Sequence, residues 1–280
     1  MTIREALEIY AREAGTQYAA RVRRWLDWGG RAEDEILARY SRHLREQGLS
    51  DGTVDLHLRT IRAFYRRFGV RPPAVRGWRF DARESRRPAL DRELIRELVS
   101  AAKRGQLFAW HAPLVALATV YGMRAAEMAA VRSEDIDVGH SRIYIRTLKG
   151  GVRRWAWLPP ELHGFLEGWQ APSPAEVERA FADIWSAVAD DPKPRGVGWH
   201  AIRRALVRDL AEAGVSSQSR IRFLRWRDAG SGAARMDALY SAPNLLVSRE
   251  GVEAVTEGDQ GSRDYDREVW DRHPYLPMWS

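Results

Sequence analysis

The chain has 280 residues, of which 45% are hydrophobic, so it can bury the core of one large domain or of two modest ones. It contains no cysteine, which excludes disulfides, thiol catalysis and thiolate metal sites. No apolar run approaches the roughly 18 residues of a membrane span. The N-terminus also lacks the basic-then-apolar order of a signal peptide, so we expect a cytoplasmic protein with no membrane contact.

The net charge is +7, and only three of the 45 basic residues are lysines. Genome composition alone can produce such a preference, but the guanidinium group also binds phosphate oxygens through paired hydrogen bonds. Residues 1–80 carry 16 arginines against 10 acidic residues, whereas residues 245–280 carry 4 against 8. We therefore expect the N-terminal part to contact nucleic acid and the acidic tail to stay away from it.

Hydrophobic residues recur at helical spacing through the first 68 residues. The spacing predicts helices at residues 16–28, 33–47 and 51–68. Thr16 is placed to cap the first helix, and Ser50 or Asp51 to open the third.

The third of these helices carries a stripe of arginines, Arg59, Arg62 and Arg66. A solvated surface is the simpler interpretation of any one of them. A stripe on a net-basic helical domain makes all three candidate contacts to DNA phosphates.

Prolines, glycines and arginines interrupt the helical pattern at residues 71–89, which we predict to be an interdomain linker. The predicted organisation is a helical DNA-binding domain at residues 1–70, a catalytic domain at 90–244 and a C-terminal tail at 245–280.

The larger domain is predicted to be mainly helical, with helices at residues 91–105, 113–120 and 125–131 and others beginning near 160, 175, 200 and 217. One stretch differs. Residues 141–148 and 152–158 alternate in polarity and are rich in β-branched and aromatic residues. They predict an antiparallel hairpin with Lys149 at its turn.

Arg124 follows a glycine that ends an apolar helix, and it precedes a new helix. It is therefore expected to point outward from a buried support, where Glu127 can reach it across one turn. Taken alone, the two residues fit an ordinary surface ion pair equally well.

His200 and Arg203 share one helical face because three residues separate them. An imidazole exchanges protons near neutral pH and a guanidinium keeps its charge, so together they could hold a phosphate and manage its proton. Lys149 has the simpler interpretation of a solubilising turn residue. Because lysine is rare in this chain, its presence here suggests a need for a side chain that can give up a proton.

Trp226 and Tyr240 bound a glycine-bearing stretch, and a short helix is predicted to lead to Tyr240. Both residue types are usually packing residues, although an indole N–H can donate to a phosphate oxygen.

In this order, these stretches resemble the catalytic domain of the tyrosine recombinase, or phage integrase, superfamily. The family pattern is an arginine in a G-[LM]-R-x-x-E context, a lysine on a hairpin turn, an H-x-x-R pair, a His or Trp, and a nucleophilic tyrosine. The segment TQYAARVRRWLDW also resembles the family's helical core-binding domain, and the long tail resembles archaeal-type members. The matching residues here are Arg124 with Glu127, Lys149, His200 with Arg203, Trp226 and Tyr240.

Two features depart from the family pattern. Fourteen positions separate Trp226 from Tyr240, which is longer than usual, and the tail contains a rival nucleophile, Tyr265. Asp264 and Asp266 flank Tyr265 and would oppose its approach to a phosphodiester, so Tyr240 is preferred.

The resemblance implies a two-domain clamp on double-stranded DNA and strand cleavage through a 3′-phosphotyrosyl intermediate. It also implies a homo-tetramer on two DNA sites, with accessory DNA-bending proteins as possible partners. No cofactor and no metal is implied, and we find neither a phosphate-binding glycine loop nor a carboxylate cluster for two magnesium ions. The tail could dock on a neighbouring subunit or on its own domain through four apolar anchors, Val269, Tyr275, Leu276 and Trp279.

Three alternatives remain. A type IB topoisomerase or a telomere resolvase uses a similar set of residues, although the compact N-terminal helical domain favours a recombinase. A catalytically silent DNA-binding relative is a second alternative, disfavoured because all six positions hold chemically competent residues. A general basic RNA-binding protein would leave the ordered set unexplained.

Overall fold

A computed structural model of the chain describes residues 1–31, 34–74, 78, 89–147, 153–194, 196–226, 234, 237 and 266–280. The chain forms two compact units, Met1–Arg86 and Arg87–Ser280. Most of the predicted linker, residues 71–89, lies outside the described residues.

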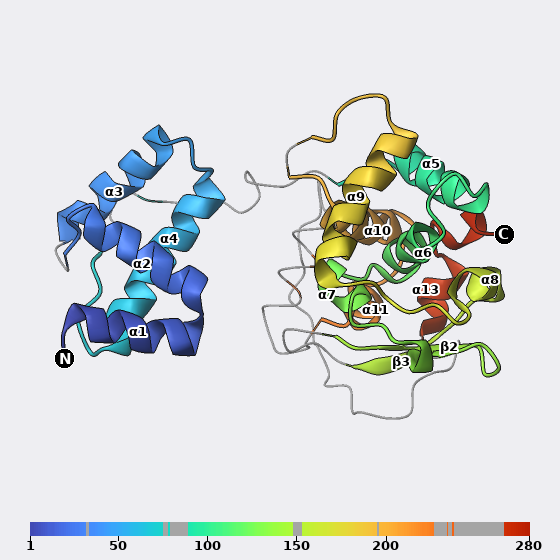
Figure 1. The fold of residues 1–280 in the computed structure, drawn as a ribbon, viewed down its shortest axis with the longest axis horizontal. Coiled ribbons are helices and arrows are strands. Elements are labelled where there is room, and N and C mark those ends of the chain that lie inside the picture. The colour runs from blue at the N-terminus through green and yellow to red at the C-terminus, as the bar shows by residue number, and fades with distance from the viewer. Residues whose placement is uncertain are drawn as a thin grey trace. The chain divides into compact units, whose positions relative to one another are not determined.

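The N-terminal unit is built from helices, and Figure 1 shows them in blue: α1 (Ile3–Ala14), α2 (Thr16–Asp27), α3 (Asp34–Glu46) and α4 (Asp51–Arg67). Their apolar faces share one core in which Trp25, Tyr40 and Ile61 are fully buried. Within this core the Nε1 of Trp25 donates to the hydroxyl of Tyr65 at 3.3 Å. The predicted helices of this unit are confirmed to within a few residues at each end.

The helix ends of this unit differ in one respect from the prediction. Ser50 caps α4, as expected, by accepting from the backbone N of Thr53 at 3.4 Å. The prediction that Thr16 is a cap is wrong, because Gly15 is the N-cap of α2 and makes no side-chain cap hydrogen bond. Since α1 runs to Ala14, one residue must reverse the chain, and Gly15 does so with φ +107°.

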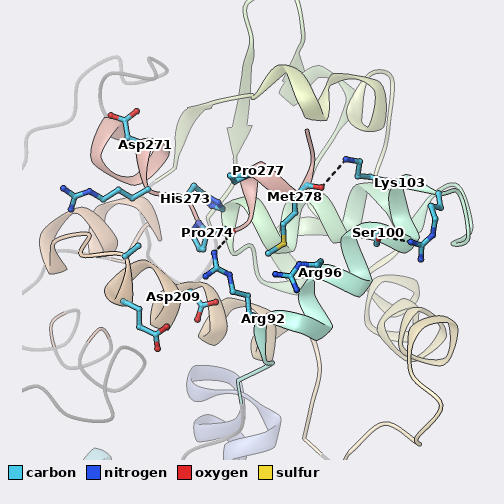
Figure 2. Close-up of a pocket in the computed structure, with 14 residues that line it drawn as sticks. Arg92, Arg96, Ser100, Lys103, Asp209, Asp271, His273, Pro274, Pro277 and Met278 are labelled. Atoms are coloured by element: carbon cyan, nitrogen blue, oxygen red, sulfur yellow. Dashed lines mark hydrogen bonds between the residues drawn. The ribbon is translucent and has the colours of Figure 1, made fainter.

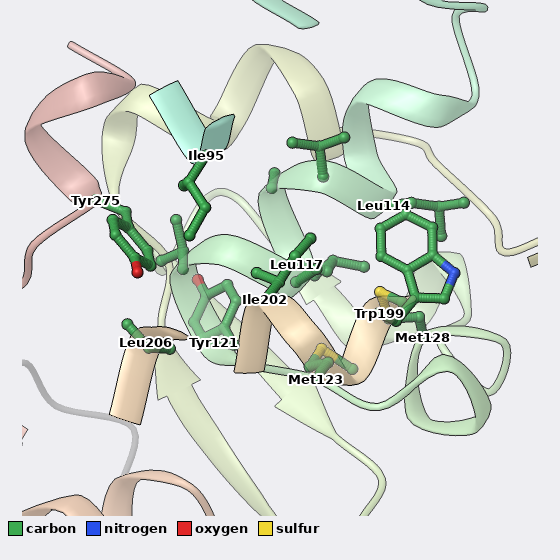
Figure 3. Close-up of a cluster of buried hydrophobic side chains, with 14 of the residues drawn as sticks. Ile95, Leu114, Leu117, Tyr121, Met123, Met128, Trp199, Ile202, Leu206 and Tyr275 are labelled. Carbon is green, nitrogen blue, oxygen red and sulfur yellow. The ribbon is translucent and has the colours of Figure 1, made fainter. Parts of the chain in front are cut away.

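The larger unit is mainly helical and surrounds α6, in which every residue is buried. In this unit α6 contacts α5, α9 and α10. Figure 3 shows side chains of this core, including Tyr121 and Met123 at the end of α6 and Ile202 from α10. The helices are α5 (Arg92–Lys103), α6 (His111–Tyr121), α7 (Ala125–Met128), α8 (His163–Leu166), α9 (Pro174–Val188), α10 (Trp199–Glu212), α11 (Ser217–Phe223) and α13 (Arg267–Asp271), with short 3₁₀ turns at Ser133–Asp135, Pro160–Leu162 and Leu276–Met278.

An antiparallel sheet of three strands lies on this unit, in the order β1 (Ile136–Asp137), β2 (Arg142–Ile145), β3 (Arg154–Trp157). The predicted hairpin is β2 and β3, and its register places Tyr144 opposite Trp155. The strand β1 was not predicted, because two residues are too few to show an alternating pattern. The predicted helix at 125–131 is also shorter, since α7 makes a single turn before the chain enters the sheet.

The described part of the C-terminal tail packs on its own unit. Val269, Tyr275 and Trp279 are almost completely buried. The hydroxyl of Tyr275 donates to Asp209 on α10 at 2.7 Å. The Nε1 of Trp279 donates to the hydroxyl of Thr119 on α6 at 3.2 Å. Of the two docking modes weighed from the sequence, the described residues therefore adopt the one on their own domain.

Helix α5 also holds this tail (Figure 2). Arg92 donates to the carbonyl of Pro274 at 3.3 Å, and the ammonium of Lys103 donates to the carbonyl of Met278 at 3.3 Å.

Among the described residues, no helix is both long enough and apolar enough to cross a membrane.

Candidate active site

Arg124 lies at the junction between α6 and α7. The helix α6 ends at Gly122, whose left-handed backbone (φ +56°) turns the chain. Arg124 then caps α7 with an extended backbone. Its backbone N donates to Oε2 of Glu127 at 2.9 Å, and its Nη1 donates to Oε1 of Glu127 at 2.6 Å. The side chain of Arg124 remains 24% exposed, so it can meet a ligand from a fixed support.

Glu127 is fully buried and faces several guanidinium groups. Burial is the largest single influence and opposes its ionisation, whereas the positive charges of Arg225, Arg203 and Arg124 favour it. Together with a backbone hydrogen bond from Arg124, they hold the pKa of Glu127 below its usual range. One carboxylate among three arginines leaves an excess of positive charge, which suits an anionic ligand.

Arg203 lies on α10 with its side chain buried. Its Nη1 donates to the carbonyl of Gly122 at 2.5 Å, and its Nη2 donates to the carbonyl of Leu224 at 2.7 Å. The guanidinium carbon lies 5.4 Å from the ring centroid of Trp226. Arg203 therefore joins the α6–α7 junction, α10 and the end of α11 at one point.

His200 lies one helical turn before Arg203 on α10, but the two side chains differ in exposure. His200 is exposed, whereas Arg203 is 1% exposed. Trp199, the residue before His200, anchors the start of the helix, because its buried Nε1 donates to the carbonyl of Val177 at 2.7 Å. His200 thus lies at the surface of a firmly held helix.

Arg225 was not predicted as a site residue, yet it is buried beside Glu127. Its Nη1 and Nη2 each lie 3.2 Å from the carbonyl of Tyr121, and Nη1 also donates to the carbonyl of Phe223 at 3.1 Å. Its Nη2 forms an ion pair with Oε2 of Glu127 at 3.4 Å. Its place between the apolar residues Leu224 and Trp226 was the only sequence signal of burial. This signal was missed because arginines are normally exposed.

Two buried ion pairs hold Asp237 and Asp266, the described residues on either side of residues 238–265. Arg220 on α11 binds Asp237 through two hydrogen bonds of 2.9 and 2.7 Å. Arg154 on β3 binds Asp266 at 2.6 Å, which ties the hairpin to the tail. The predicted residues Lys149, Tyr240 and Tyr265 lie outside the described residues.

The predicted DNA-contact residues all lie on α4 of the N-terminal unit. Arg59 and Arg66 are exposed and Arg62 is half-buried. Arg59 pairs with Asp55 at 2.5 Å within the same helix, so part of its charge is neutralised.

A separate pocket opens where α5, α10 and the tail meet, and Figure 2 shows its lining. Its charged residues include Arg96 and Asp271, and it contains none of the residues predicted for the site. Within the described parts of the chain, His, Asp and Glu residues form no group that could hold a metal ion.

The sequence comparisons point to one class of protein. No family model matches the chain. Tyrosine recombinase XerA of Thermococcus kodakarensis is 27% identical over 191 residues, which cover 67% of this chain and 65% of that protein. Tyrosine recombinase XerA of Thermococcus onnurineus is 28% identical over 165 residues, which cover 55% of this chain and 53% of that protein. The chain thus spans between about half and two thirds of the length of these relatives.

Solved structures agree on the fold. The Tn1549 transposon integrase in complex with transposon right end DNA has a TM-score of 0.64 and 14% identity, covering 88% of this chain and 96% of that chain. A lambda integrase tetramer bound to a Holliday junction has a TM-score of 0.62 and 16% identity, covering 89% of this chain and 81% of that chain. The resemblance to the tyrosine recombinase superfamily is confirmed, as is a mainly helical fold with a small antiparallel sheet.

Proposed function

We propose, on the premise of this similarity to tyrosine recombinases, that the chain is a site-specific DNA recombinase that cuts and rejoins strands through a 3′-phosphotyrosyl intermediate. One observation carries the proposal. Glu127 holds the guanidinium of Arg124, and Arg203 donates to the carbonyl of Gly122, so two arginines that are far apart in the sequence meet at the α6–α7 junction. Arg203 in turn lies against Trp226. An anion-binding centre built in this way is what a phosphodiester requires.

In this proposal, Arg124 and Arg203 stabilise the negative charge of the phosphodiester during the reaction. A phosphodiester repels nucleophiles because it is anionic, and negative charge grows on its non-bridging oxygens as the tyrosine attacks. Arg124 and Arg203 stabilise that charge from fixed positions, because a carboxylate and two backbone carbonyls already hold their guanidinium groups. Trp226 adds a hydrogen bond from its indole N–H.

The remaining residues account for bond exchange. The phenolic oxygen of Tyr240 forms a bond to phosphorus while the bond from phosphorus to the 5′ oxygen breaks. His200 receives the tyrosine proton, and Lys149 gives a proton to the departing 5′ oxygen. The covalent link conserves the bond energy, so a different 5′ hydroxyl can reverse the step without ATP.

DNA contact by the rest of the chain follows the same proposal. The N-terminal helical unit and the catalytic unit close on double-stranded DNA as a clamp, and Arg59, Arg62 and Arg66 bind phosphates. A homo-tetramer on two sites fits the lambda integrase tetramer bound to a Holliday junction, whose fold this chain shares. Accessory DNA-bending proteins are further partners to be sought.

The proposal is tested with a library of nicked duplexes that carry random sequence on both sides of the nick. The nick lets the short cleaved fragment leave, so a covalent complex accumulates and its DNA can be sequenced. We expect a detergent-resistant adduct with the wild type, with a free 5′ hydroxyl on the released fragment, and none with Tyr240→Phe. A 5′-linked adduct, or none at all, would contradict the proposal.

The relatives do not favour the topoisomerase alternative, and a second substrate separates the two activities. A supercoiled plasmid that lacks the selected sequence should remain supercoiled with the wild type. Relaxation of that plasmid would identify a topoisomerase instead.

A further inference from the structure

Arg225 combines two unusual features that the proposed reaction leaves unexplained. Its side chain is 2% exposed, although it carries a permanent charge. Its backbone is left-handed, with φ +57°. Residues other than glycine rarely adopt this conformation, because Cβ then crowds the following carbonyl. Strained backbone of this kind persists where the surrounding contacts over-determine it, and it concentrates at functional sites.

The contacts of Arg225 lead to the candidate site. Its guanidinium binds the carbonyls of Tyr121 and Phe223, and it pairs with Glu127 at 3.4 Å. Glu127 in turn holds both the backbone and the guanidinium of Arg124. A continuous chain of contacts therefore runs from Arg225 through Glu127 to the exposed arginine.

We infer that Arg225 is a positioning residue for strand cleavage, because it fixes Glu127 and, through Glu127, sets the guanidinium of Arg124 against the phosphate. This inference rests on the proposed recombinase function. The Nη1 and Nη2 atoms of Arg225 bind the carbonyls of Tyr121 and Phe223 and the carboxylate of Glu127, so we place its effect in the contact with that carboxylate.

The charges around Glu127 support this role. Arg225 contributes more than any other charge to lowering the pKa of Glu127, followed by Arg203. Arg124 also faces the carboxylate, and Arg154 of β3 lies close to Arg225. Without Arg225, burial of Glu127 is less well opposed, so its pKa rises and the acid form is populated at a higher pH. A protonated Glu127 no longer attracts Arg124.

The left-handed backbone provides a clean test of the inference. Glycine adopts φ +57° without strain, so Arg225→Gly removes the guanidinium and leaves the backbone favourable. Arg225→Lys keeps the charge but loses the forked geometry. Arg208→Gln is the matched control, because Arg208 pairs with the buried carboxylate of Asp209 at 2.7 Å in the same unit and lies outside the site.

The rate of adduct formation on the selected nicked duplex is measured from pH 5 to pH 9. We expect Arg225→Gly to cleave roughly 100-fold more slowly, with the acid limb of its profile moved to higher pH. The affinity for the duplex should change little, Arg225→Lys should recover part of the rate, and Arg208→Gln should match the wild type. An Arg225→Gly rate equal to the wild type, or reduced equally at every pH, would overturn the inference while the function stands.

A second measurement does not depend on activity. The free energy of unfolding of wild type and Arg225→Gly is compared between pH 7 and pH 4. In the variant the buried carboxylate is protonated more easily in the folded state, so the stability difference should shrink as the pH falls. If the wild type forms no Tyr240-dependent adduct, the function fails, and this comparison still decides whether Arg225 holds Glu127. A constant difference would overturn that contact.

Discussion

The carboxylate of Glu127 binds both ends of Arg124, accepting from its backbone N at 2.9 Å and from its Nη1 at 2.6 Å. The backbone hydrogen bond fixes where α7 begins, and the side-chain hydrogen bond fixes where the guanidinium points. One residue thus sets both the local fold and the direction of the candidate catalytic group.

The first prediction concerns the stability that this carboxylate provides. Glu127→Gln keeps the shape of the side chain but removes the buried carboxylate that pairs with Arg225 and Arg124. We expect the free energy of unfolding in urea at pH 7 to fall by about 3 kcal/mol. Glu212→Gln is the control, because Glu212 is 65% exposed and its pairing with Arg208 should be worth less than about 0.5 kcal/mol. Equal losses in the two variants would contradict the prediction.

The second prediction concerns the turn that delivers Arg124. A Cβ at Gly122 would lie 2.9 Å from Cδ2 of Leu224 and 3.1 Å from Cδ2 of Leu206. Gly122→Ala therefore introduces both left-handed backbone strain and a clash. We expect its free energy of unfolding in urea to be about 3 kcal/mol lower than that of the wild type. At Gly105, with φ +67°, nothing lies within 4 Å of an added Cβ. Gly105→Ala thus measures the strain alone, about 1 kcal/mol, and a similar cost at both glycines would show that no clash occurs.

Much of this arrangement follows from local sequence, and the part that does not depends on long-range contacts. The apolar run before Gly122 predicted α6, and the three-residue spacing predicted the reach of Glu127 to Arg124. The role of Arg225 could not be predicted, since the carbonyl of Tyr121 that satisfies it is supplied by a segment about one hundred residues away. The strand β1 was missed because two residues carry no periodic pattern.

The third prediction is a pH dependence of the docked tail. His273 is buried, its Nε2 contacts the carbonyl of Val120 at 2.8 Å, and burial lowers its pKa to about 4. In the unfolded chain an ordinary histidine has a pKa of about 6.5, so the unfolded state binds the proton first. Stability from this residue is therefore complete above pH 6.5 and is lost as the pH falls towards 4.

The magnitude is tested by comparing the wild type with His273→Gln. We expect the free energy of unfolding of the wild type to fall by about 3 kcal/mol more than that of the variant between pH 7 and pH 4. The other histidines are present in both proteins, so their contributions cancel. Parallel curves would show that His273 titrates normally in the folded state.

The fourth prediction concerns which subunit supplies the nucleophile. Arg220 and Ser217 on α11 hold the carboxylate of Asp237, three residues before Tyr240 in the sequence. Three residues of chain reach at most about 11 Å, so we expect Tyr240 to attack the phosphate bound by its own subunit.

A mixing experiment decides this point. Tyr240→Phe retains the arginines and Arg124→Ala retains the nucleophile, so each lacks a different part of the reaction. We expect no adduct from a mixture of the two on the nicked duplex. An adduct at a substantial fraction of the wild-type rate would mean that one subunit supplies Tyr240 to its neighbour.

The most direct test of the account is to identify the residue that becomes linked to DNA. The wild-type adduct is digested with a protease and a nuclease, and the peptide that retains a nucleotide is sequenced by mass spectrometry. The account predicts a 3′-phosphotyrosyl link at Tyr240, with the same link formed by Tyr265→Phe. A nucleotide on Tyr265, or an adduct that persists in Tyr240→Phe, would contradict it.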